Sequence, residues 1–510
     1  MNLLTVPVLL PMLGAALTLI LGRRPRVQRA VSILVLAGVV VAAGTLALRA
    51  HTDGVQTLWV GAWPQGYGIA LVADRLSAIM LTVAGLVTLA VLFYSAGQEE
   101  EEVRKETPVS IFHPTFLLMC AGVSNAFLAG DLFNMFVGFE ILLFASYVLL
   151  TMGGTKSRIR AGSIYVVVNL LSSMLFLTAL ANIYAAVGSV NLAQIAQRMP
   201  DLPEATQGQL QFMLLLVFAI KAAVFPLSAW LPDSYPTAPA PVTAVFAGLL
   251  TKVGVYAILR TQTLIFPHRP LSELLMWIAL LTMIVGILGA IAQVEIKRLL
   301  SFTLVSHIGY MMLGIALATP AGLAATIYYT AHHITIQATL FLVAGLIQRV
   351  GHSNNLDRLS GLMTTSPLLA VLFLVPGMNL AGIPPFSGFI GKLGLLEAAT
   401  AEGTPLSLAL VVTSVLTSLL TLYAIAKVWN RAFWGTPVAI TRGGDEDEDE
   451  DDDNSGRLMP GVMVGATMAL IAFSLTLTFV AGPAYEYTKD AATALLDGAY
   501  VRAVLGEVTP

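Results

Sequence analysis

The chain has 510 residues, of which 57% are hydrophobic and 11% are charged, and its formal net charge is −3. An average soluble protein has roughly 25% charged residues, so this composition excludes a soluble enzyme or nucleic-acid-binding protein and predicts an all-α polytopic membrane protein. The single cysteine, Cys120, excludes an intrachain disulfide and a cysteine-ligated cluster. No dinucleotide fingerprint, phosphate-binding loop or zinc spacing is present, so we expect no cofactor and no metal.

About fourteen apolar segments are long enough to span a bilayer as helices by the ~20-residue criterion. They lie at approximately 3–21, 30–50, 69–94, 111–129, 132–151, 161–186, 210–231, 240–264, 272–292, 300–318, 322–347, 366–400, 406–429 and 459–482. We interpret the first as a helix rather than a signal peptide, because its arginines follow the apolar run instead of preceding it.

Basic residues set the orientation. With the N-terminus outside, seventeen arginines and lysines fall in inner loops, and seven, including Arg75 and Arg260, fall in outer loops or ends. By the positive-inside rule, this bias predicts a plasma-membrane protein with both termini outside. Two acidic runs, 99–102 and 445–453, fall in inner loops and are either solvated, disordered loops or cation-attracting surfaces. The tail from Tyr485 is mildly amphipathic and is expected on the outer surface.

Two lysines, Lys221 and Lys252, interrupt apolar runs on either side of a proline-rich stretch. A lysine in the middle of a membrane helix costs at least ~2.5–3.5 kcal/mol on insertion scales, so it is rarely there by accident. Proline removes a backbone donor, and a broken helix at membrane depth is tolerated only inside protein or against water. We therefore predict a helix broken at Pro226 and then a second helix, each with a buried lysine.

A carboxylate lies at a similar depth. Glu140 is nine residues into the helix that begins near Asp131, about 14 Å along it, which places Glu140 close to the middle of a ~30 Å core. Glu140 and Lys221 could form a structural ion pair, in which desolvation offsets much of the attraction, or a switchable pair in a proton relay. We favour the relay, because Lys252 has no obvious acid of its own and an unpaired buried lysine can exchange protons near neutrality.

Three histidines lie in the tenth and eleventh segments: His307, His332 and His333. Histidine titrates between pH 5 and 8, which suits a proton carrier; the alternative for each is a core histidine bonded to a backbone carbonyl. His332 and His333 point about 100° apart on a helix, so at most one need face a given path. Gln337 adds to the polar side of the same segment, and Asp131 is a further supporting polar residue at the outer edge of the fifth.

The twelfth segment carries a second break at Gly382, Pro384 and Pro385, followed by Lys392. Five helices separate the two breaks, so they run in opposite directions, as in an inverted five-helix repeat. We divide the chain into N-terminal helices (1–110), a first inverted repeat of helices 4–8 (111–265), a second of helices 9–13 (266–430), an acidic inner loop (431–458), and helix 14 with an outer tail (459–510).

Four stretches carry a resemblance: DLFNMFVGFE (131–140), FAIKAAVFPLSAWLPDSYPTAPAPVTAVFAGLLTKVGVY (218–256), SHIGY (306–310) and AGIPPFSGFIGK (381–392). Together they resemble the proton-pumping antiporter-like subunits of respiratory complex I, of membrane hydrogenases and of Mrp-type multisubunit sodium/proton antiporters. The resemblance covers roughly residues 70 to 430. It implies a fourteen-helix fold with helices seven and twelve broken, and a polar axis along the membrane plane.

By that resemblance, Glu140 and Lys221 are the pair between helices five and seven, and Lys252 is the connecting lysine of helix eight. His333 matches the histidine of helix eleven, and Lys392 is the terminal residue of helix twelve. The resemblance implies a transporter subunit, not an enzyme, that works with other membrane subunits of one hetero-oligomer in the lipid bilayer and moves H⁺, with Na⁺ carried by the complex.

Within the family, Lys392 argues against the complex I subunit type that has glutamate there, and the lack of a long C-terminal extension argues against the large A subunit of Mrp antiporters. Gln337 departs from relatives that have a lysine at this position. The D-subunit type of the Mrp antiporters is the best match, and a redox-driven complex I or hydrogenase subunit is the alternative. A third hypothesis is a scaffold whose buried charges only fix helix packing.

Overall fold

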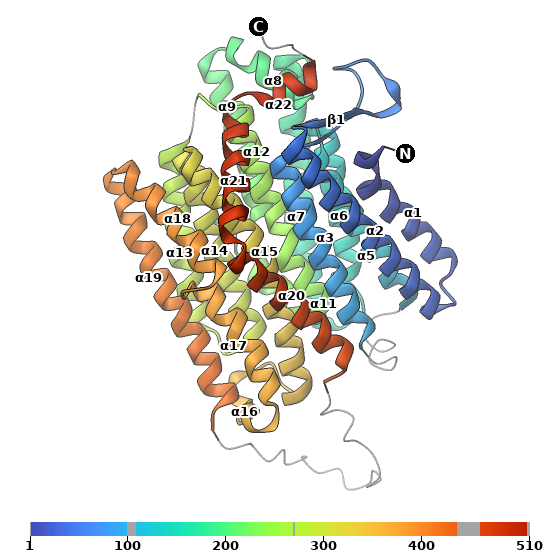
Figure 1. Cartoon of the computed structure of the whole chain (residues 1–510), viewed down its shortest axis with the longest axis vertical. Helices are drawn as coiled ribbons and strands as arrows, with labels where there is room; N and C mark the ends of the chain where they lie inside the picture. Colours follow the sequence, from blue (N-terminus) through green and yellow to red (C-terminus); the bar gives the residue numbers. More distant parts are fainter. Residues whose placement is uncertain (1, 99–108, 269–270, 436–458, 507–510) are drawn as a thin grey trace.

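The computed structural model describes residues 2–98, 109–268, 271–435 and 459–506. Most of the long helices stand side by side in one bundle, along its longest axis (Figure 1). The first short helix, η1 (Leu3–Thr5), and the last, α22 (Ala499–Leu505), lie toward the same end of the bundle, the upper end in Figure 1. Both acidic runs, 99–102 and 445–453, lie outside the described residues.

The N-terminal part consists of two helices, a small hairpin and a third helix. Its elements are α1 (Val6–Ile20), α2 (Pro25–Thr52), β1 (Gln56–Trp59), β2 (Ala70–Ala73) and α3 (Arg75–Ala96). The strands are antiparallel, with Gln56 opposite Ala73. Asp74 then starts α3 with a capping box, since its carboxylate accepts the Ser77 N–H and the Ser77 hydroxyl accepts the Asp74 N–H.

The remaining long and short helices follow in chain order. They are α5 (Val109–Leu128), α6 (Leu132–Thr151), α7 (Lys156–Val187), α8 (Leu192–Arg198), α9 (Glu204–Ala222), α10 (Trp230–Ser234), η4 (Tyr235–Thr237), α11 (Ala240–Val245), the π-helix η5 (Phe246–Leu250), α12 (Thr251–Leu264), α13 (Ser272–Ala292), α14 (Ile296–Leu317), α15 (Pro320–Gly351), α16 (Leu362–Thr365), α17 (Pro367–Ala381), α18 (Ser387–Glu402), α19 (Pro405–Val428), α20 (Gly461–Phe479), α21 (Ala481–Leu496) and α22.

Among the described residues, twelve helices are long and apolar enough to cross a membrane, with α11, η5 and α12 counted as one of them. The all-α polytopic fold is therefore confirmed. The two predicted segments without a continuous equivalent are 210–231 and 366–400, which correspond to α9 with the turn after it and to α17 with α18. Each of these two segments is split by a break, so neither counts among the twelve long apolar helices. The predicted number of fourteen membrane crossings stays a prediction.

The two helix breaks lie where the prolines predict them. After α9, Ala223 has a φ of 56°, and the Phe225–Pro226 peptide bond that follows is cis. After α17, Gly382 has a φ of 83°, and the Pro384–Pro385 bond is cis. A positive φ turns the chain out of the right-handed helix and proline offers no N–H donor, so neither helix can continue. The predicted breaks at Pro226 and at Gly382, Pro384 and Pro385 are confirmed.

A matched pair of backbone contacts links the two halves of the chain. The connection before α6 forms an isolated antiparallel bridge with the segment after α7, with Asp131 opposite Asn191. The connection before α14 forms the same kind of bridge with the segment after α15, with Glu295 opposite Asn355. These places are equivalent in the two predicted repeats. The bridges support the inverted repeat, which stays a prediction.

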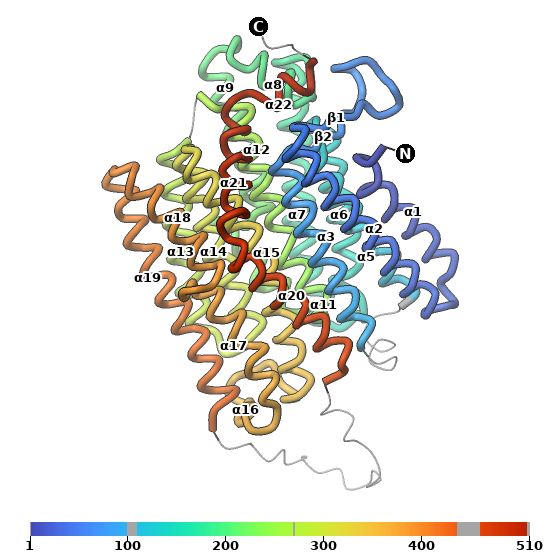
Figure 2. The backbone as a smooth tube through the Cα atoms, in the orientation of Figure 1, coloured from blue at the N-terminus to red at the C-terminus, as the bar shows by residue number. Residues whose placement is uncertain are grey.

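The C-terminal segment differs from the prediction. In Figure 2, the red tube of α21 runs lengthwise along the bundle toward its upper end. The helix packs against α15, and Thr488, Ala491 and Leu495 are buried on its inner side. The Tyr487 hydroxyl donates to the Ala47 carbonyl at 3.3 Å. The expectation that the tail from Tyr485 lies on the outer surface is therefore wrong for α21, because its apolar face is covered by other helices of the bundle.

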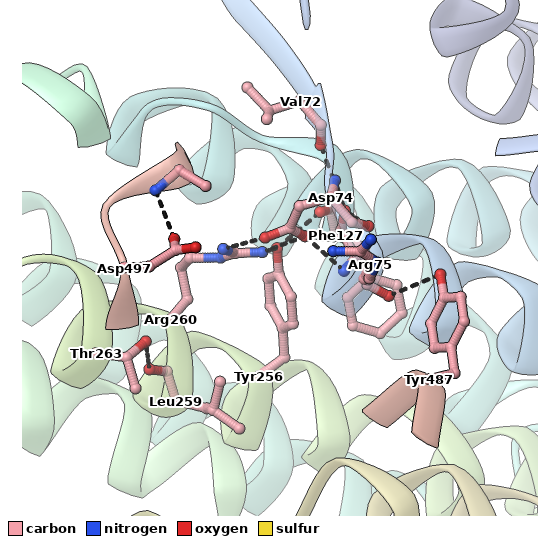
Figure 3. Close-up of polar contacts among 12 residues, drawn as sticks. Val72, Asp74, Arg75, Phe127, Tyr256, Leu259, Arg260, Thr263, Tyr487 and Asp497 are labelled. Atoms are coloured by element: carbon pink, nitrogen blue, oxygen red, sulfur yellow. Dashed lines mark hydrogen bonds and ion pairs between the residues drawn. The ribbon is translucent and has the colours of Figure 1, made fainter. Parts of the chain in front are cut away.

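A buried ion pair connects the start of α3 to α12 (Figure 3). The Arg260 guanidinium donates to both Asp74 carboxylate oxygens, at 2.6 and 2.7 Å, and lies 4.9 Å from the Tyr500 ring centre. Burial alone raises the pKa of Asp74, but Arg260 and the Ser77 hydrogen bonds outweigh it and hold that pKa below its usual value. Arg260, which the charge count assigns to outer loops or ends, lies near the end of α12, inside the predicted helix 240–264, and it is buried beneath Tyr500 of α22.

Candidate functional site

The first cluster of the site joins α6, α7 and α9. The Ser173 hydroxyl donates a short hydrogen bond to the Glu140 carboxylate, and the Lys221 ammonium lies 3.4 Å from the same hydroxyl oxygen. Lys221 also lies over the Phe139 ring, 5.0 Å from its centre. No direct ion pair joins Glu140 to Lys221 in the described part of the chain. The two residues predicted to pair are therefore brought together, but a serine lies between them.

Glu140 lies at the edge of the bundle. It is only half-buried, whereas Lys221 is buried. On α6 it follows Phe133 by seven residues and precedes Phe144 by four, and both of these side chains are exposed. Residues at this spacing share one face of a helix. The cluster therefore begins near the outer face of α6 and continues inward to Lys221.

A small cavity with a mixed polar and apolar lining lies beside Lys221. Its volume is about 10 Å³, and its lining includes Tyr165, Asn169, Tyr235, Lys221 and Leu250. That volume is near the lower limit for one water molecule, which needs roughly 10–15 Å³ and polar partners. The Tyr235 hydroxyl is buried and has no partner among the described residues, so it could hold such a water. Leu250 belongs to η5, which leads into α12, so the cavity lies between Lys221 and this helix.

Lys252 is completely buried in the first turn of α12. Its ammonium donates to the Ala247 carbonyl at 2.5 Å. Ala247 lies in the π-helix η5, and such a local widening of the helix is frequent at functional sites. Within the described residues no carboxylate forms an ion pair with Lys252. The protonated form of this lysine is therefore balanced only by dipoles.

A group of aromatic and imidazole rings follows on α14 and α15. His333 is fully buried, and its ring centre is 5.2 Å from that of His307 and 6.0 Å from that of Tyr329. His307 Nδ1 is 2.8 Å from the Tyr329 hydroxyl, and its Nε2 is 3.3 Å from the Thr421 hydroxyl. His333 is close enough to Lys252 for their charges to interact. This group of rings is thus a neighbour of Lys252.

The two adjacent histidines have different environments. Both ring nitrogens of His333 lack a hydrogen-bond partner among the described residues. His332 instead faces the break in the twelfth segment, with Nδ1 2.9 Å from the Ser387 hydroxyl. None of the three histidines bonds to a backbone carbonyl in the described part of the chain. The alternative of core histidines bonded to backbone carbonyls is therefore wrong.

Lys392 occupies the break itself. Its ammonium donates to the carbonyls of Leu380 and Ala381, at 3.1 and 3.0 Å, and to the Ser418 hydroxyl at 3.1 Å. Both carbonyls belong to the last turn of α17, where helix carbonyls have no intrahelical partner and carry partial negative charge. A Cβ on Gly382 would lie 2.8 Å from Lys392 Cδ, so glycine is required for this approach. The break therefore creates the binding place for the lysine.

Tyr310 connects Lys392 with the histidines. Its ring centre is 5.5 Å from that of His307, and Lys392 Nζ lies 4.9 Å from the centre of the Tyr310 ring. The Tyr310 hydroxyl is 2.9 Å from the Ser418 hydroxyl that also accepts from Lys392. Beside Lys392, a cavity of about 190 Å³ lined by Gly382, Leu393 and Ser418 lies between α18 and α19. The row of polar groups thus ends at the opposite side of the bundle from α6.

Two predicted supporting residues lie outside this row. Asp131 precedes α6 and caps it, with one carboxylate oxygen accepting the Asn134 N–H at 2.6 Å and the other buried without a partner among the described residues. Burial raises the pKa of Asp131 to about 6. The Gln337 amide donates to the Leu300 carbonyl at 2.7 Å, which ties α15 to α14. Among the described residues, neither forms a hydrogen bond or ion pair with a predicted proton-transfer residue.

The prediction from sequence omitted the hydroxyl groups that link the charged residues. These are Ser173, Tyr310, Tyr329 and Ser418. Two of them could have been predicted from their spacing. Tyr310 follows His307 by three residues and Tyr329 precedes His333 by four, so each shares a helix face with a histidine. Ser173 and Ser418 could not have been predicted, because a lone serine in an apolar helix usually bonds its own backbone.

Comparisons with known proteins agree with this geometry. The family described as "NADH:quinone oxidoreductase/Mrp antiporter, TM" matches residues 129–417. The chain is 37% identical over 510 residues to a protein of Alkalihalophilus pseudofirmus that is named as the D subunit of a Na(+)/H(+) antiporter, covering 99% of this chain and 100% of that one.

Solved structures show the same fold. A chain of the Mrp complex from Dietzia sp. DQ12-45-1b superposes with a TM-score of 0.88 at 34% identity, over 99% of both chains. A chain of respiratory complex I from Thermus thermophilus gives a TM-score of 0.81 at 24% identity, over 99% of this chain and 100% of that one, a likeness of fold alone. With a family match over more than half its length and a full-length relative above 30% identity, this chain belongs to the NADH:quinone oxidoreductase/Mrp antiporter family of membrane subunits.

Proposed function

We propose that this chain is a proton-translocating subunit of a multisubunit cation/proton antiporter that exchanges Na⁺ for H⁺. The similarity to a protein named as the D subunit of a Na⁺/H⁺ antiporter and to a chain of an Mrp complex supports this function. Its partners are the other membrane subunits of the same hetero-oligomer. It is a transport component rather than an enzyme.

One observation supports the proton-relay mechanism most strongly: Lys252 is fully buried and has no carboxylate partner among the described residues. In the relay, it stands between the Glu140–Lys221 cluster and the histidine cluster. An uncompensated buried ammonium is unstable in its charged form, so it can release its proton to a neighbour. The relay runs through the groups that the sequence singled out, in the order Glu140, Lys221, Lys252, His333 and Lys392.

Glu140 acts as the switch of this relay. When the carboxylate is ionised, it stabilises the protonated form of Lys221 through Ser173; when it takes up a proton, that stabilisation is lost. Lys221 then passes its proton by way of the small cavity toward Lys252. Because a hydroxyl both donates and accepts, Ser173 can change partners without moving a charged group.

We also propose how the chain is oriented in the membrane. We place the chain in the plasma membrane with both termini outside, which the basic inner loops and the common end of η1 and α22 in Figure 1 support. We assign residues 111–265 and 266–430 to two inverted repeats, supported by the two equivalent backbone bridges. One break and one set of buried cations then belong to each half.

Replacing Lys252 by methionine tests the mechanism. We expect Na⁺-driven proton movement in vesicles containing the purified complex to fall more than tenfold. The thermal stability of the complex should stay equal or rise, because removing an unpaired buried charge removes its desolvation cost. The measurement is a pH-sensitive dye trapped in the vesicles, with an imposed Na⁺ gradient and no electron donor.

Lys489→Met is the matched control, since this lysine is exposed on α21 in a surface pair with Glu486. It should transport normally. Normal transport by Lys252→Met would instead favour the scaffold hypothesis. If the unaltered complex moved protons only with an electron donor, the alternative of a redox-driven subunit would replace antiport.

A further inference from the structure

A basic cavity lies at the start of α7, apart from the predicted relay. Its volume is about 560 Å³, and it is bounded by α7, α10, η4 and α14. Its lining includes three basic residues, one acidic residue, a serine and an isoleucine: Lys156, Arg160, Arg298, Asp233, Ser157 and Ile164. None of them contacts the row from Glu140 to Lys392, so the cavity has no part in the mechanism proposed above.

The cavity has unbalanced positive charge. Arg298 pairs with Asp233 at 2.8 Å, whereas Lys156 and Arg160 have no hydrogen bond or ion pair with any described residue. The Arg298 Nε–H is also shielded from solvent and lacks an acceptor among these residues. Three cations therefore face one carboxylate. The first turn of α7 adds the positive end of its helix dipole, which favours an anion.

The walls of the cavity are fixed by protein contacts. Arg158, on a different face of α7 from Lys156 and Arg160, is buried and donates to the Thr237 carbonyl at 3.1 Å and to the Met152 carbonyl at 3.0 Å. These bonds hold η4 and the end of α6 against α7. The neighbouring cations of α7 are thus left facing the cavity rather than the protein backbone.

An apolar stripe continues from the cavity along α7. Ile164, Val167 and Leu171 follow Arg160 at intervals of four, three and four residues, and they are 42%, 66% and 55% exposed. Residues at these intervals lie on one face of a helix, so the stripe extends from the basic cavity into the membrane. A free phosphate would use only the cavity, whereas an amphiphile would use both parts.

We infer that this surface binds an anionic phospholipid. The phosphate occupies the cavity among Lys156, Arg160 and Arg298, and an acyl chain lies along Ile164, Val167 and Leu171. Arginine and lysine are suited to phosphate oxygens, and basic pockets between helices at the cytoplasmic side of a membrane protein bind such head groups. The inference holds whether or not the relay is correct, because it rests on none of the same side chains.

Lipid binding to the purified whole complex tests this inference. The complex is stripped of lipid in detergent, incubated with phosphatidylglycerol, and weighed by native mass spectrometry. We expect the double variant Lys156→Gln/Arg160→Gln to retain one lipid fewer, with at least tenfold weaker binding. The variant Arg23→Gln/Arg26→Gln loses the same charge from residues that do not line this cavity, and it should match the unaltered complex.

Two further arms separate the sources of the anion. Phosphatidylcholine should not occupy the site, and inorganic phosphate should not displace bound phosphatidylglycerol. Displacement by inorganic phosphate would overturn the lipid assignment in favour of a free-phosphate site. Equal lipid retention by the cavity variant and the control would overturn the site itself. If the double variant does not assemble, Arg160→Gln alone is compared with Arg26→Gln, with the same criteria.

Discussion

Serine hydroxyl groups, rather than direct ion pairs, link charged residues at both ends of the predicted relay. Ser173 lies between Glu140 and Lys221, and Ser418 lies between Lys392 and Tyr310. A direct buried ion pair holds both charges in place and resists separation. A hydroxyl between the partners gives each charge a polar neighbour and leaves it free to change protonation state, which suits a relay better than a structural bridge.

Ser173→Ala removes the hydroxyl oxygen that links Glu140 to Lys221, and so tests the role of this hydroxyl in the relay. A hydrogen bond to a charged group is worth about 1.5–3 kcal/mol, so losing the bridge between Glu140 and Lys221 should lower Na⁺-driven proton transport roughly tenfold or more. Initial rates in vesicles at matched protein content are the measurement. Ser172→Ala is the control, because the Ser172 hydroxyl donates to the Val217 carbonyl at 3.2 Å. Equal rates for both variants would remove Ser173 from the relay.

Asp131 predicts a dependence of stability on pH. Burial raises its pKa to about 6 in the folded protein, from a usual value near 3.9. Between these values the folded protein holds a proton that the unfolded chain has released, so this residue lowers stability as the pH rises from about 4 to 6.

Asp131→Asn should remove that contribution and keep the cap of α6, since asparagine caps helices as well as aspartate. The melting temperature of the variant should therefore exceed that of the unaltered protein above pH 6 and approach it near pH 4. Thermal melts of the detergent-solubilised complex across this range are the measurement. A variant that melts below the unaltered protein above pH 6, with the gap closing toward pH 4, would show that the pKa of Asp131 is lowered instead.

At both helix breaks, a side-chain donor bonds to carbonyls in the last turn of the broken helix, but the donor residue differs. At the end of α17 the free carbonyls of Leu380 and Ala381 accept from Lys392, which enters from the following helix. At the end of α9 the Ile220 carbonyl accepts from the Trp230 indole N–H at 3.2 Å. A lysine is therefore not needed after the first break, where Lys221 lies before it. This explains why both halves of the chain have a helix break, whereas the nearby lysine precedes the first break and follows the second.

Gly382→Ala tests the second break as an element. A non-glycine residue at positive φ costs about 1–2 kcal/mol, and here a Cβ would also lie 2.8 Å from Lys392 Cδ. We expect transport to fall more than tenfold, because Lys392 must leave its carbonyl partners. Gly403→Ala, at the end of α18, has a similar φ of 68° but only one atom near the added Cβ, at 4.0 Å.

Both glycine variants should lose a similar amount of thermal stability from the backbone alone. Only Gly382→Ala should also lose transport. Transport by Gly382→Ala at the level of Gly403→Ala would show that the contact of Lys392 with the break is dispensable.

At the scale of the whole molecule, the buried ion pair of Asp74 with Arg260 connects distant parts of the chain. Asp74 caps the start of α3 and pairs with Arg260 near the end of α12 (Figure 3). The ring of Tyr500, from α22, covers the guanidinium. Breaking a buried pair leaves one charge without compensation, at a cost of about 3–5 kcal/mol. This pair is therefore expected to hold the N-terminal and C-terminal parts of the bundle together at its upper end.

Asp74→Asn should lower the melting temperature of the complex strongly, and the double variant Asp74→Asn/Arg260→Gln should recover part of the loss, since no charge is then stranded. Asp357→Asn is the control. It breaks the exposed pair with Arg431, and exposed pairs contribute about 0–1 kcal/mol. Similar melting temperatures for Asp74→Asn and Asp357→Asn would argue that the buried pair is not structural.

The sequence by itself determined the class of the fold and the identity of the buried charges. Long apolar runs require helices in a membrane, and a lysine such as Lys252 inside one is too costly to be incidental. Proline and glycine break a helix by local geometry, so the breaks at Pro226 and Gly382 were also predictable. Each of these conclusions depends only on a residue and its near neighbours along the chain.

The tertiary structure decided which groups meet. Ser173 joins Glu140 to Lys221 from a third helix, His333 and His332 face different neighbours, and α21 is covered by α15. The burial of Arg260 could not be predicted without its partner Asp74, which lies 186 positions earlier in the chain. Such contacts depend on how helices pack around one another, and helical periodicity fixes the face of a helix but not the helix that covers it.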